Sequence, residues 1–223
     1  MMTEAHIHIL PELDDGAESV EVSRKMLEIL ISQGVEQIYA TPHFYAHREK
    51  SVGDFLQKRQ KSYEKMGSPE NIHLGAEIAI EHGISELPDI EKLAFEGTNL
   101  ILLEFPYTGY SSWMKEEIYN ISVTYKLKPV IAHVHRYLNL FSREQMESVL
   151  EMDVIFQVNN EAFGSFKQRR FVKKLIKEGY PIIFGSDSHD LSDRKPNWDL
   201  FQKKVSADVI KRSESILEAA KRK

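Results

Sequence analysis

The 223-residue sequence contains no cysteine. This absence excludes a disulfide framework, thiolate metal ligands and cleavage of phosphate esters by a cysteine nucleophile. It also fits a reducing compartment, so we expect a cytoplasmic location.

Long apolar segments are missing as well. The N-terminal residues Met1–His6 lack a basic stretch followed by an apolar run, which is the pattern of a secretory signal. Elsewhere the apolar runs are far shorter than the ~18–20 residues that cross a bilayer. We therefore expect no insertion into a membrane.

An excess of basic charge is the third absence. The formal net charge is -5 with 28% charged residues. This balance argues against broad nucleic-acid binding, although it leaves room for a small local basic patch. A chain of this length with 42% hydrophobic residues suits one α/β domain with a large core. We predict a single domain over residues 1–223 and no nucleic-acid partner.

What the sequence does contain is an alternation of short β-prone runs with longer amphipathic, charged stretches. This alternation is typical of successive βα units and a largely parallel sheet. The predicted strands are Ala5–Leu10, Gln37–Thr41, Ile72–Ile78, Leu100–Phe105, Val130–Val134, Val154–Val158 and Pro181–Phe184. The predicted helices are Val20–Gln33, Gly53–Met66, Gly83–Phe95, Ser112–Tyr125, Arg143–Met152, Lys167–Glu178 and Trp198–Lys221. Seven strand–helix units are one fewer than in the eight-unit barrel. In parallel α/β folds the functional residues lie in the loops that follow the carboxyl ends of the strands.

Potential metal ligands stand at six of the seven predicted strand ends. His6 and His8 are two residues apart, so both imidazoles point to the same side of the first strand. Asp14 and Asp15 follow, just before a glycine that permits a tight turn. The remaining candidates are His43, Glu77, Glu104, His133, Asp187 and His189.

Taken singly, each of these residues is more often a core, loop or turn residue than a ligand. Their joint placement after apolar runs favours metal coordination, because burying such groups unpaired is costly. Imidazole and carboxylate suit manganese, iron or zinc, and the number of candidates indicates two or three ions. Three other histidines do not follow this pattern and are interpreted as surface or structural residues: His47, His73 and His82.

Three further residues lie beside these candidates. His135 would lie on the same side of the fifth strand as His133. It could contact the metal ligands without binding an ion itself, although this interpretation is open. Arg136 and Arg194 follow the last ligands of their strands, and a guanidinium group binds phosphate oxygens bidentately. We predict phosphate binding by both, with simple solvation as the alternative for Arg194.

The motif His6–His8 followed by Asp14–Gly16 resembles the opening motif of the PHP (polymerase and histidinol phosphatase) superfamily. It is most similar to a bacterial tyrosine-phosphatase branch that is encoded with capsular or exopolysaccharide genes. The resemblance spans about residues 4–196. Five more motifs follow in the order of the family: Ala40–His43, Gly75–Ile78, Leu103–Phe105, Pro129–His133 and Ser186–His189.

This resemblance implies a distorted seven-unit (β/α) barrel, similar to a TIM barrel, that holds three metal ions, usually manganese. One ion would be bound by His6, His8, Glu77 and Asp187, a second by Glu77, Glu104 and His133, and a third by Asp15, His43 and His189. Arg136 and Arg194 match arginines that bind the substrate phosphate. The implied activity is hydrolysis of phosphotyrosine on a bacterial tyrosine kinase that acts in capsule or exopolysaccharide synthesis.

The sequence departs from the family pattern at three positions. Glu4 replaces the usual Asp before the first histidine, His135 replaces a usual Glu, and Lys195 replaces a Pro. Two alternatives to the tyrosine phosphatase are a small-molecule phosphatase, such as one acting on histidinol phosphate, and a metal-stabilised regulatory module without activity. The compact Asp14–Gly16 motif favours the tyrosine phosphatase, and the full ligand set argues against the module. The sequence makes no prediction of oligomeric state.

Overall fold

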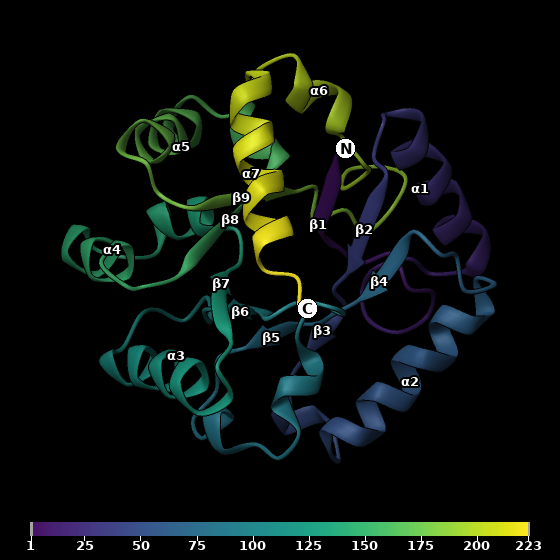
Figure 1. Ribbon diagram of the computed structural model, residues 1–223, viewed down its shortest axis with the longest axis horizontal. Helices are drawn as coiled ribbons and strands as arrows, with labels where there is room; N and C mark the ends of the chain where they lie inside the picture. Colours follow the sequence, from purple (N-terminus) through teal and green to yellow (C-terminus); the bar gives the residue numbers. More distant parts are fainter. Residues whose placement is uncertain (1, 223) are drawn as a thin grey trace.

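The computed structural model describes residues 2–222, and its named strands pair in parallel within two sheets (Figure 1). The three-stranded sheet has the order β1 (Thr3–Ile7), β2 (Gln37–Ala40) and β4 (Ile72–Leu74). The six-stranded sheet has the order β3 (His43–Phe44), β5 (Glu77–Ala79), β6 (Leu100–Glu104), β7 (Lys128–Ile131), β8 (Ile155–Asn159) and β9 (Ile182–Gly185). The parallel α/β class predicted from the sequence is confirmed.

The two sheets are joined at both edges. On one side the main chain runs from β2 into β3 and from β4 into β5, and parallel pairing continues through the Gly75 amide, which donates to the Ala40 carbonyl at 2.8 Å. On the other side Ile7 and Ser188 form a parallel bridge. The Asp187 amide there donates to the His6 carbonyl at 2.7 Å. The carboxyl ends of all strands therefore meet at one face.

The helices are α1 (Val20–Ser32), α2 (Val52–Lys65), α3 (Ser112–Tyr125), α4 (Arg143–Leu150), α5 (Phe166–Glu178), α6 (Trp198–Gln202) and α7 (Ala207–Ala219). Short 3-10 helices are η1 (Ala46–Arg48), η2 (Ile84–Glu86), η3 (Ile90–Leu93), η4 (Val134–Asn139) and η5 (Asn160–Phe163). Most helices surround the strands (Figure 1). Within residues 2–222, no helix combines the length and apolarity needed to cross a bilayer.

Two apolar layers hold this arrangement together. Along β6, Leu100 and Leu102 join an inner cluster, whereas Ile101 and Leu103 join the larger cluster beneath the helices. Leu217 of α7 completes the inner cluster. Successive residues of a strand point to opposite faces of the sheet. In this parallel sheet one face packs against the inner cluster and the other against the helices, so both faces are buried. This explains why β6 is apolar at four consecutive positions before its terminal glutamate.

Several predicted elements were wrong in extent. The predicted helix Gly83–Phe95 is two 3-10 helices, η2 and η3, because Pro88 lacks an amide proton and forces the preceding residue into an extended conformation. The predicted helix Trp198–Lys221 is divided into α6 and α7. The predicted strand Ile72–Ile78 is interrupted at Gly75 and Ala76, where the chain passes from one sheet to the other.

The predicted strand Val130–Val134 also ends early. β7 stops at Ile131, and His133 has a left-handed backbone with a φ of 31°. The 3-10 helix η4 begins directly afterwards. The chain therefore turns sharply at the candidate ligand instead of extending past it.

Glu4 ties the first and last strands to α6. Its buried carboxylate accepts hydrogen bonds from the Ser186 amide at 2.8 Å and from the His6 amide at 3.0 Å. It also accepts one from the Trp198 indole at 2.7 Å. Gly185 leaves the space for this side chain, since an added Cβ would lie 2.7 Å from Glu4 Oε1. The glutamate side chain is long enough to reach the Trp198 indole while it also accepts from the two amides.

We expect Trp198→Phe to lower the free energy of unfolding by about 1–3 kcal/mol, because a buried carboxylate oxygen loses a donor. Urea denaturation monitored by circular dichroism measures this change. Trp113→Phe is the control, since Trp113 is partly exposed and stacks on His82. Equal losses in the two variants would contradict the role of the Glu4 bond.

Candidate metal centre

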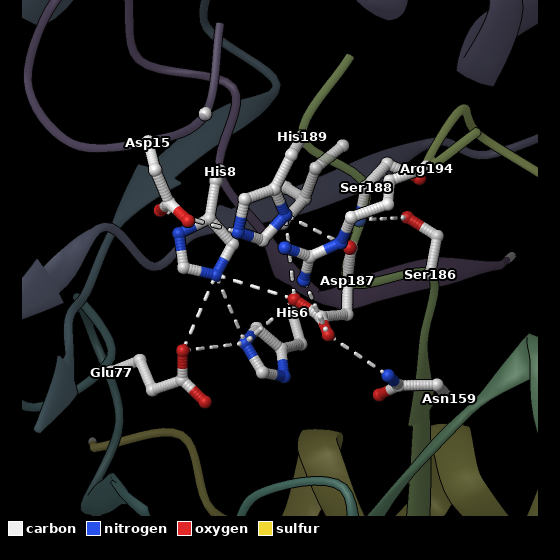
Figure 2. Close-up of polar contacts among 12 residues, drawn as sticks. His6, His8, Asp15, Glu77, Asn159, Ser186, Asp187, Ser188, His189 and Arg194 are labelled. Atoms are coloured by element: carbon white, nitrogen blue, oxygen red, sulfur yellow. Dashed lines mark hydrogen bonds and ion pairs between the residues drawn. The ribbon is translucent and has the colours of Figure 1, made fainter. Parts of the chain in front are cut away.

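The candidate ligands gather at the carboxyl ends of the strands (Figure 2). Among the described residues, three groups have ligand atoms within 4.8 Å of one another: His8, Asp15, His43 and His189; His6, His8 and Asp187; and His43, Glu77 and Glu104. The structure thus brings together eight of the nine predicted ligands in these groups. The ninth, His133, contacts the third group, with Nε2 lying 3.3 Å from Glu104 Oε1.

Glu77 lies at the centre of the cluster and is buried. Its Oε2 atom is 3.2 Å from His6 Nε2, 3.3 Å from His8 Nε2 and 3.1 Å from His43 Nδ1. Its Oε1 atom is 2.9 Å from His133 Nε2. Figure 2 shows the carboxylate pointing at His6 and His8. Among the nine candidates within the described residues, Glu77 alone contacts four imidazoles, although it joins only one of the three groups.

Hydrogen bonds at the Nδ1 atoms, on the side away from the cluster, orient three of the imidazoles. His8 Nδ1 is 2.7 Å from Asp14 Oδ2, and His6 Nδ1 is 3.1 Å from Gln157 Oε1. His189 Nδ1 is 3.0 Å from a main-chain carbonyl. Gly16 permits the close approach of the Asp14 turn, since an added Cβ would lie 2.2 Å from the His8 carbonyl oxygen. In each histidine the Nε2 atom is left to face the cluster, as is usual for metal-binding imidazoles.

The cluster contains buried atoms whose hydrogen bonding is incomplete. His6 Nε2 and His8 Nε2 face each other at 3.3 Å. Glu77 Oε2, His43 Nδ1 and His189 Nε2 have no hydrogen-bond partner within residues 2–222. Buried polar atoms in proteins are normally paired, so several converging unpaired atoms call for a ligand. The set of nitrogen and oxygen donors fits manganese, iron or zinc.

The charges of the cluster also favour bound cations. Burial raises the pKa of Glu77, but the charge on His6 and a hydrogen bond to His133 outweigh it and hold that pKa well below its usual value. The pKa of Asp187 is likewise well below its usual value, because His6 outweighs burial. Burial lowers the pKa of His133, whereas Glu104 and Glu77 raise it, with a net value of about 9. Glu77 and Asp187 therefore stay ionised, and their negative charge favours a cation bound between them and the neighbouring imidazoles.

One edge of the cluster is open to solvent. Asp15 Oδ1 is 3.4 Å from His43 Nε2 and 3.5 Å from His189 Nε2, and the Asp15 side chain is 65% exposed. His8 joins these three residues, which differs from the set implied by the resemblance, where His8 belongs to another ion alone. This edge gives a substrate direct access to the cluster.

Both predicted phosphate-binding arginines lie at the rim of the cluster. Arg136 Nη1 is 2.7 Å from Asp187 Oδ2, and its Nη2 is 2.6 Å from Glu161 Oε1. Arg194 Nη2 is 3.0 Å from Asp187 Oδ2, and its guanidinium points at Asp187 in Figure 2. Asp187 has a left-handed backbone with a φ of 52°. It thus links the candidate ligands to the two arginines.

Two residues of β8 belong to the site although the sequence pattern did not predict them. Gln157 Oε1 accepts a hydrogen bond from the His133 amide at 2.6 Å in addition to its contact with His6. Asn159 donates from Nδ2 to Asp187 Oδ2 at 3.0 Å. Both are fully buried. Their spacing of two residues within an apolar strand was the available signal, since it places both amides on the face that bears the ligands.

The histidines set aside in the sequence analysis join no ligand group among residues 2–222. His47 is exposed and lies 2.8 Å from Glu81. His82 stacks on Trp113 with ring centroids 3.6 Å apart, and His73 is hydrogen-bonded to a glutamine at 2.5 Å. The prediction that these three are surface or structural residues agrees with their positions.

His135 lies in η4, so the premise that it shares a strand face with His133 was wrong. It is nevertheless buried, and its Nε2 atom is 3.7 Å from Glu161 Oε1. Burial lowers the pKa of His135 to about 4, so the imidazole is neutral. His135 packs behind Glu161, the partner of Arg136.

The sequence is similar to those of known proteins over most of its length. A family model described as capsular polysaccharide synthesis, CpsB/CapC, matches residues 2–217. The tyrosine-protein phosphatase CpsB of Streptococcus pneumoniae is 30% identical over 234 residues, covering 94% of this chain and 93% of the relative. The tyrosine-protein phosphatase YwqE of Bacillus subtilis is 26% identical over 86% of this chain and 79% of the relative.

The fold is similar to solved structures. A crystal structure from work on YwqE of Bacillus subtilis and CpsB of Streptococcus pneumoniae, described as metal-dependent tyrosine phosphatases, has a TM-score of 0.77 and 24% identity. The match covers 98% of this chain and 94% of that chain. The phosphotriesterase homology protein of Escherichia coli has a TM-score of 0.54, 12% identity, and coverage of 95% and 94%. At these identities the likeness establishes the fold alone.

Proposed function

The chain belongs to the CpsB/CapC family of capsular polysaccharide synthesis, and we propose that it is a metal-dependent protein-tyrosine phosphatase. The observation that carries this proposal is the cluster of histidines and carboxylates around Glu77, flanked by Arg136 and Arg194. Named relatives with this activity support it. We further propose that the two joined sheets form the distorted seven-unit barrel of the PHP fold.

We propose that three manganese ions are held by overlapping ligand sets around Glu77. The nine ligands are His6, His8, Asp15, His43, Glu77, Glu104, His133, Asp187 and His189. Bound metal ions would activate water and neutralise charge on the phosphoryl oxygens. The protein holds the ligands in place through Asp14, Gln157 and Asn159.

Arg136 and Arg194 are proposed to bind the phosphoryl oxygens of the substrate. Their guanidinium groups converge on Asp187 from the partly exposed rim, with side chains 23% and 37% exposed. Glu161 holds Arg136 from the other side. Two guanidinium groups aimed at one point supply charge where it develops on the transferring phosphoryl group.

An aromatic residue beside this rim supports an aryl phosphate as the substrate. Tyr107 is 50% exposed and stacks near His133, with ring centroids 6.1 Å apart. Burial raises the pKa of the Tyr107 hydroxyl, and the positive charge of Arg136 opposes this rise. A planar ring beside the phosphate site offers a face on which the tyrosine ring of a substrate can pack.

The substrate proposed is a bacterial tyrosine kinase that carries phosphotyrosine and acts in capsule or exopolysaccharide synthesis. The cysteine-free sequence fits a reducing cytoplasm, where we propose that both proteins work. The alternative small-molecule activity, such as hydrolysis of histidinol phosphate, shares the same metal chemistry. Comparing kcat/KM for a phosphotyrosine peptide and for histidinol phosphate on one preparation separates the two.

We expect exhaustive chelation to abolish hydrolysis of a phosphotyrosine peptide and Mn²⁺ to restore it better than other ions. The physical reason is that the ligand cluster cannot activate water through its side chains alone. Metal content is followed by elemental analysis alongside the rate. Full activity in verified metal-free protein would overturn the proposed mechanism. Kinase binding with no hydrolysis after Mn²⁺ loading would favour the regulatory module.

A further inference from the structure

Helix α5 concentrates positive charge in a chain that is acidic as a whole. It spans 13 residues, Phe166–Glu178, and the net charge of the chain is -5. Its single carboxylate is Glu178, and its cations are Lys167, Arg169, Arg170, Lys173, Lys174 and Lys177. A helix so unlike the rest of the surface is a candidate for binding a partner of opposite charge.

Five of these cations, all except Arg169, line a groove of about 630 Å³ together with Leu138, Phe171 and Glu178. The opposite face of α5 is fixed to the core by Val172 and Leu175. Lys167, Arg170, Lys174 and Lys177 recur at helical spacing, so they lie along one side of the helix.

The groove has few counter-charges of its own. Its one ion pair among residues 2–222 joins Lys174 to Glu178 at 3.8 Å. Arg170, Lys173 and Lys177 are exposed and have no ion-pair partner in that part of the chain. Their charge is therefore available to an external anion.

One end of the groove contacts the 3-10 helix that carries Arg136. Lys167 Nζ donates to the Leu138 carbonyl at 3.2 Å and to Asn139 Oδ1 at 2.6 Å, at the end of the same η4 that carries Arg136. On the other side, η5 immediately precedes α5 and carries Glu161, which pairs with Arg136. α5 then runs away along the outside of the strands (Figure 1).

We propose that this groove binds an acidic segment of the protein substrate that flanks the phosphotyrosine. The inference rests on the proposed phosphatase activity. A helix of 13 residues is about 20 Å long. That length accommodates roughly six residues of extended peptide. The connection through η4 and η5 favours a segment of the substrate over an anionic membrane surface, since the row of cations starts beside the 3-10 helix that carries Arg136.

Exposed charges of this kind act mainly by attracting the substrate and holding it near the site, so the effect should depend on salt. The probes are two phosphotyrosine peptides that differ only in flanking residues, with Asp and Glu in one and Asn and Gln in the other. We expect kcat/KM of the Mn²⁺-loaded enzyme to be about tenfold higher for the acidic peptide at low salt. The preference should vanish between about 0.01 M and about 1 M salt, as the Debye length falls from about 30 Å to about 3 Å.

The groove variant is Arg170→Glu with Lys173→Glu and Lys177→Glu. The matched control is Arg24→Glu with Lys25→Glu and Lys61→Glu, which makes the same charge change at exposed positions of α1 and α2, across the strands from α5 (Figure 1).

We expect the groove variant to lose the preference for the acidic peptide and the control to keep it. Both should hydrolyse para-nitrophenyl phosphate at the wild-type rate. Equal loss in both variants would overturn the inference, because net charge and not the groove would then be responsible.

Three further results decide the matter. If the wild-type enzyme hydrolyses both peptides equally at low salt, the groove inference fails while the proposed function stands. If the Mn²⁺-loaded enzyme hydrolyses neither peptide nor para-nitrophenyl phosphate, both fail. If there is no peptide preference, but wild-type protein sediments with phosphatidylserine vesicles and the groove variant does not, the groove serves a lipid surface and our inference is wrong.

Discussion

Glu77→Ala is expected to lower turnover of a phosphotyrosine peptide by more than about 10²-fold. Loss of a residue that only supports a metal ligand typically costs about 10–100-fold, so loss of a shared ligand should cost more. Glu77 is buried and contacts the imidazoles of four histidines. Removing it would leave two proposed metal positions without their shared carboxylate. It would also leave the histidines facing one another without the negative charge that holds them together.

The measurement is kcat and metal stoichiometry on purified protein with Mn²⁺ in excess. His73→Ala is the matched control, since His73 lies on β4 outside every ligand group among the described residues. We expect His73→Ala to be nearly as active as wild type. Similar activities for the two variants would show that the ligand assignment is wrong.

Arg136→Ala is expected to lower kcat by about 10²–10³-fold while leaving metal content unchanged. A guanidinium is cationic and cannot bind a metal, whereas loss of one charged donor aimed at the transition state has a cost of this size. Arg136→Lys should recover part of the activity, because an ammonium group lacks the planar fork of donors.

A structural role for Arg136 makes a different prediction, since Arg136 pairs with Glu161 at 2.6 Å and with Asp187 at 2.7 Å. If these pairs only brace the rim, Arg136→Ala should lower the Tm and change turnover little, and Glu161→Gln should do the same. If Arg136 binds phosphate, Glu161→Gln should be much milder than Arg136→Ala. Melting temperature, metal content and kinetics on the same preparations distinguish the two roles.

The sequence predicts the site best where an ionisable residue interrupts or ends an apolar run. Apolar runs gave the positions of the strands, because strands covered on both faces are apolar throughout. Residues such as His6, Glu104 and His189 stand out because they interrupt or end those runs. Parallel topology then brings distant strand ends together, as in the contact of His6 with Glu77. The gathering of the candidate ligands therefore follows from the parallel direction of the strands.

Other features depend on tertiary contacts that a single sequence does not reveal. The division of β4 from β5 at Gly75 depends on which strand lies alongside, and periodicity carries no such information. Gln157 and Asn159 are neutral amides, which resemble ordinary polar strand residues until the histidine and aspartate they contact are known. By contrast, Pro88 is a visible signal against a continuous helix, because it lacks an amide donor.

The left-handed backbones of His133 and Asp187 have a consequence for the evolution of heat resistance in this protein. Each has a positive φ, 31° and 52° respectively, in a region that is costly for residues with a Cβ, by about 1–3 kcal/mol. Glycine at either position would release this strain and remove a proposed ligand in the same step. Among residues 2–222, four other non-glycine residues with a positive φ are not proposed ligands, so glycine there would release comparable strain without touching the metal centre. A thermophilic descendant that remains active must therefore gain its stability at such positions and not at His133 or Asp187.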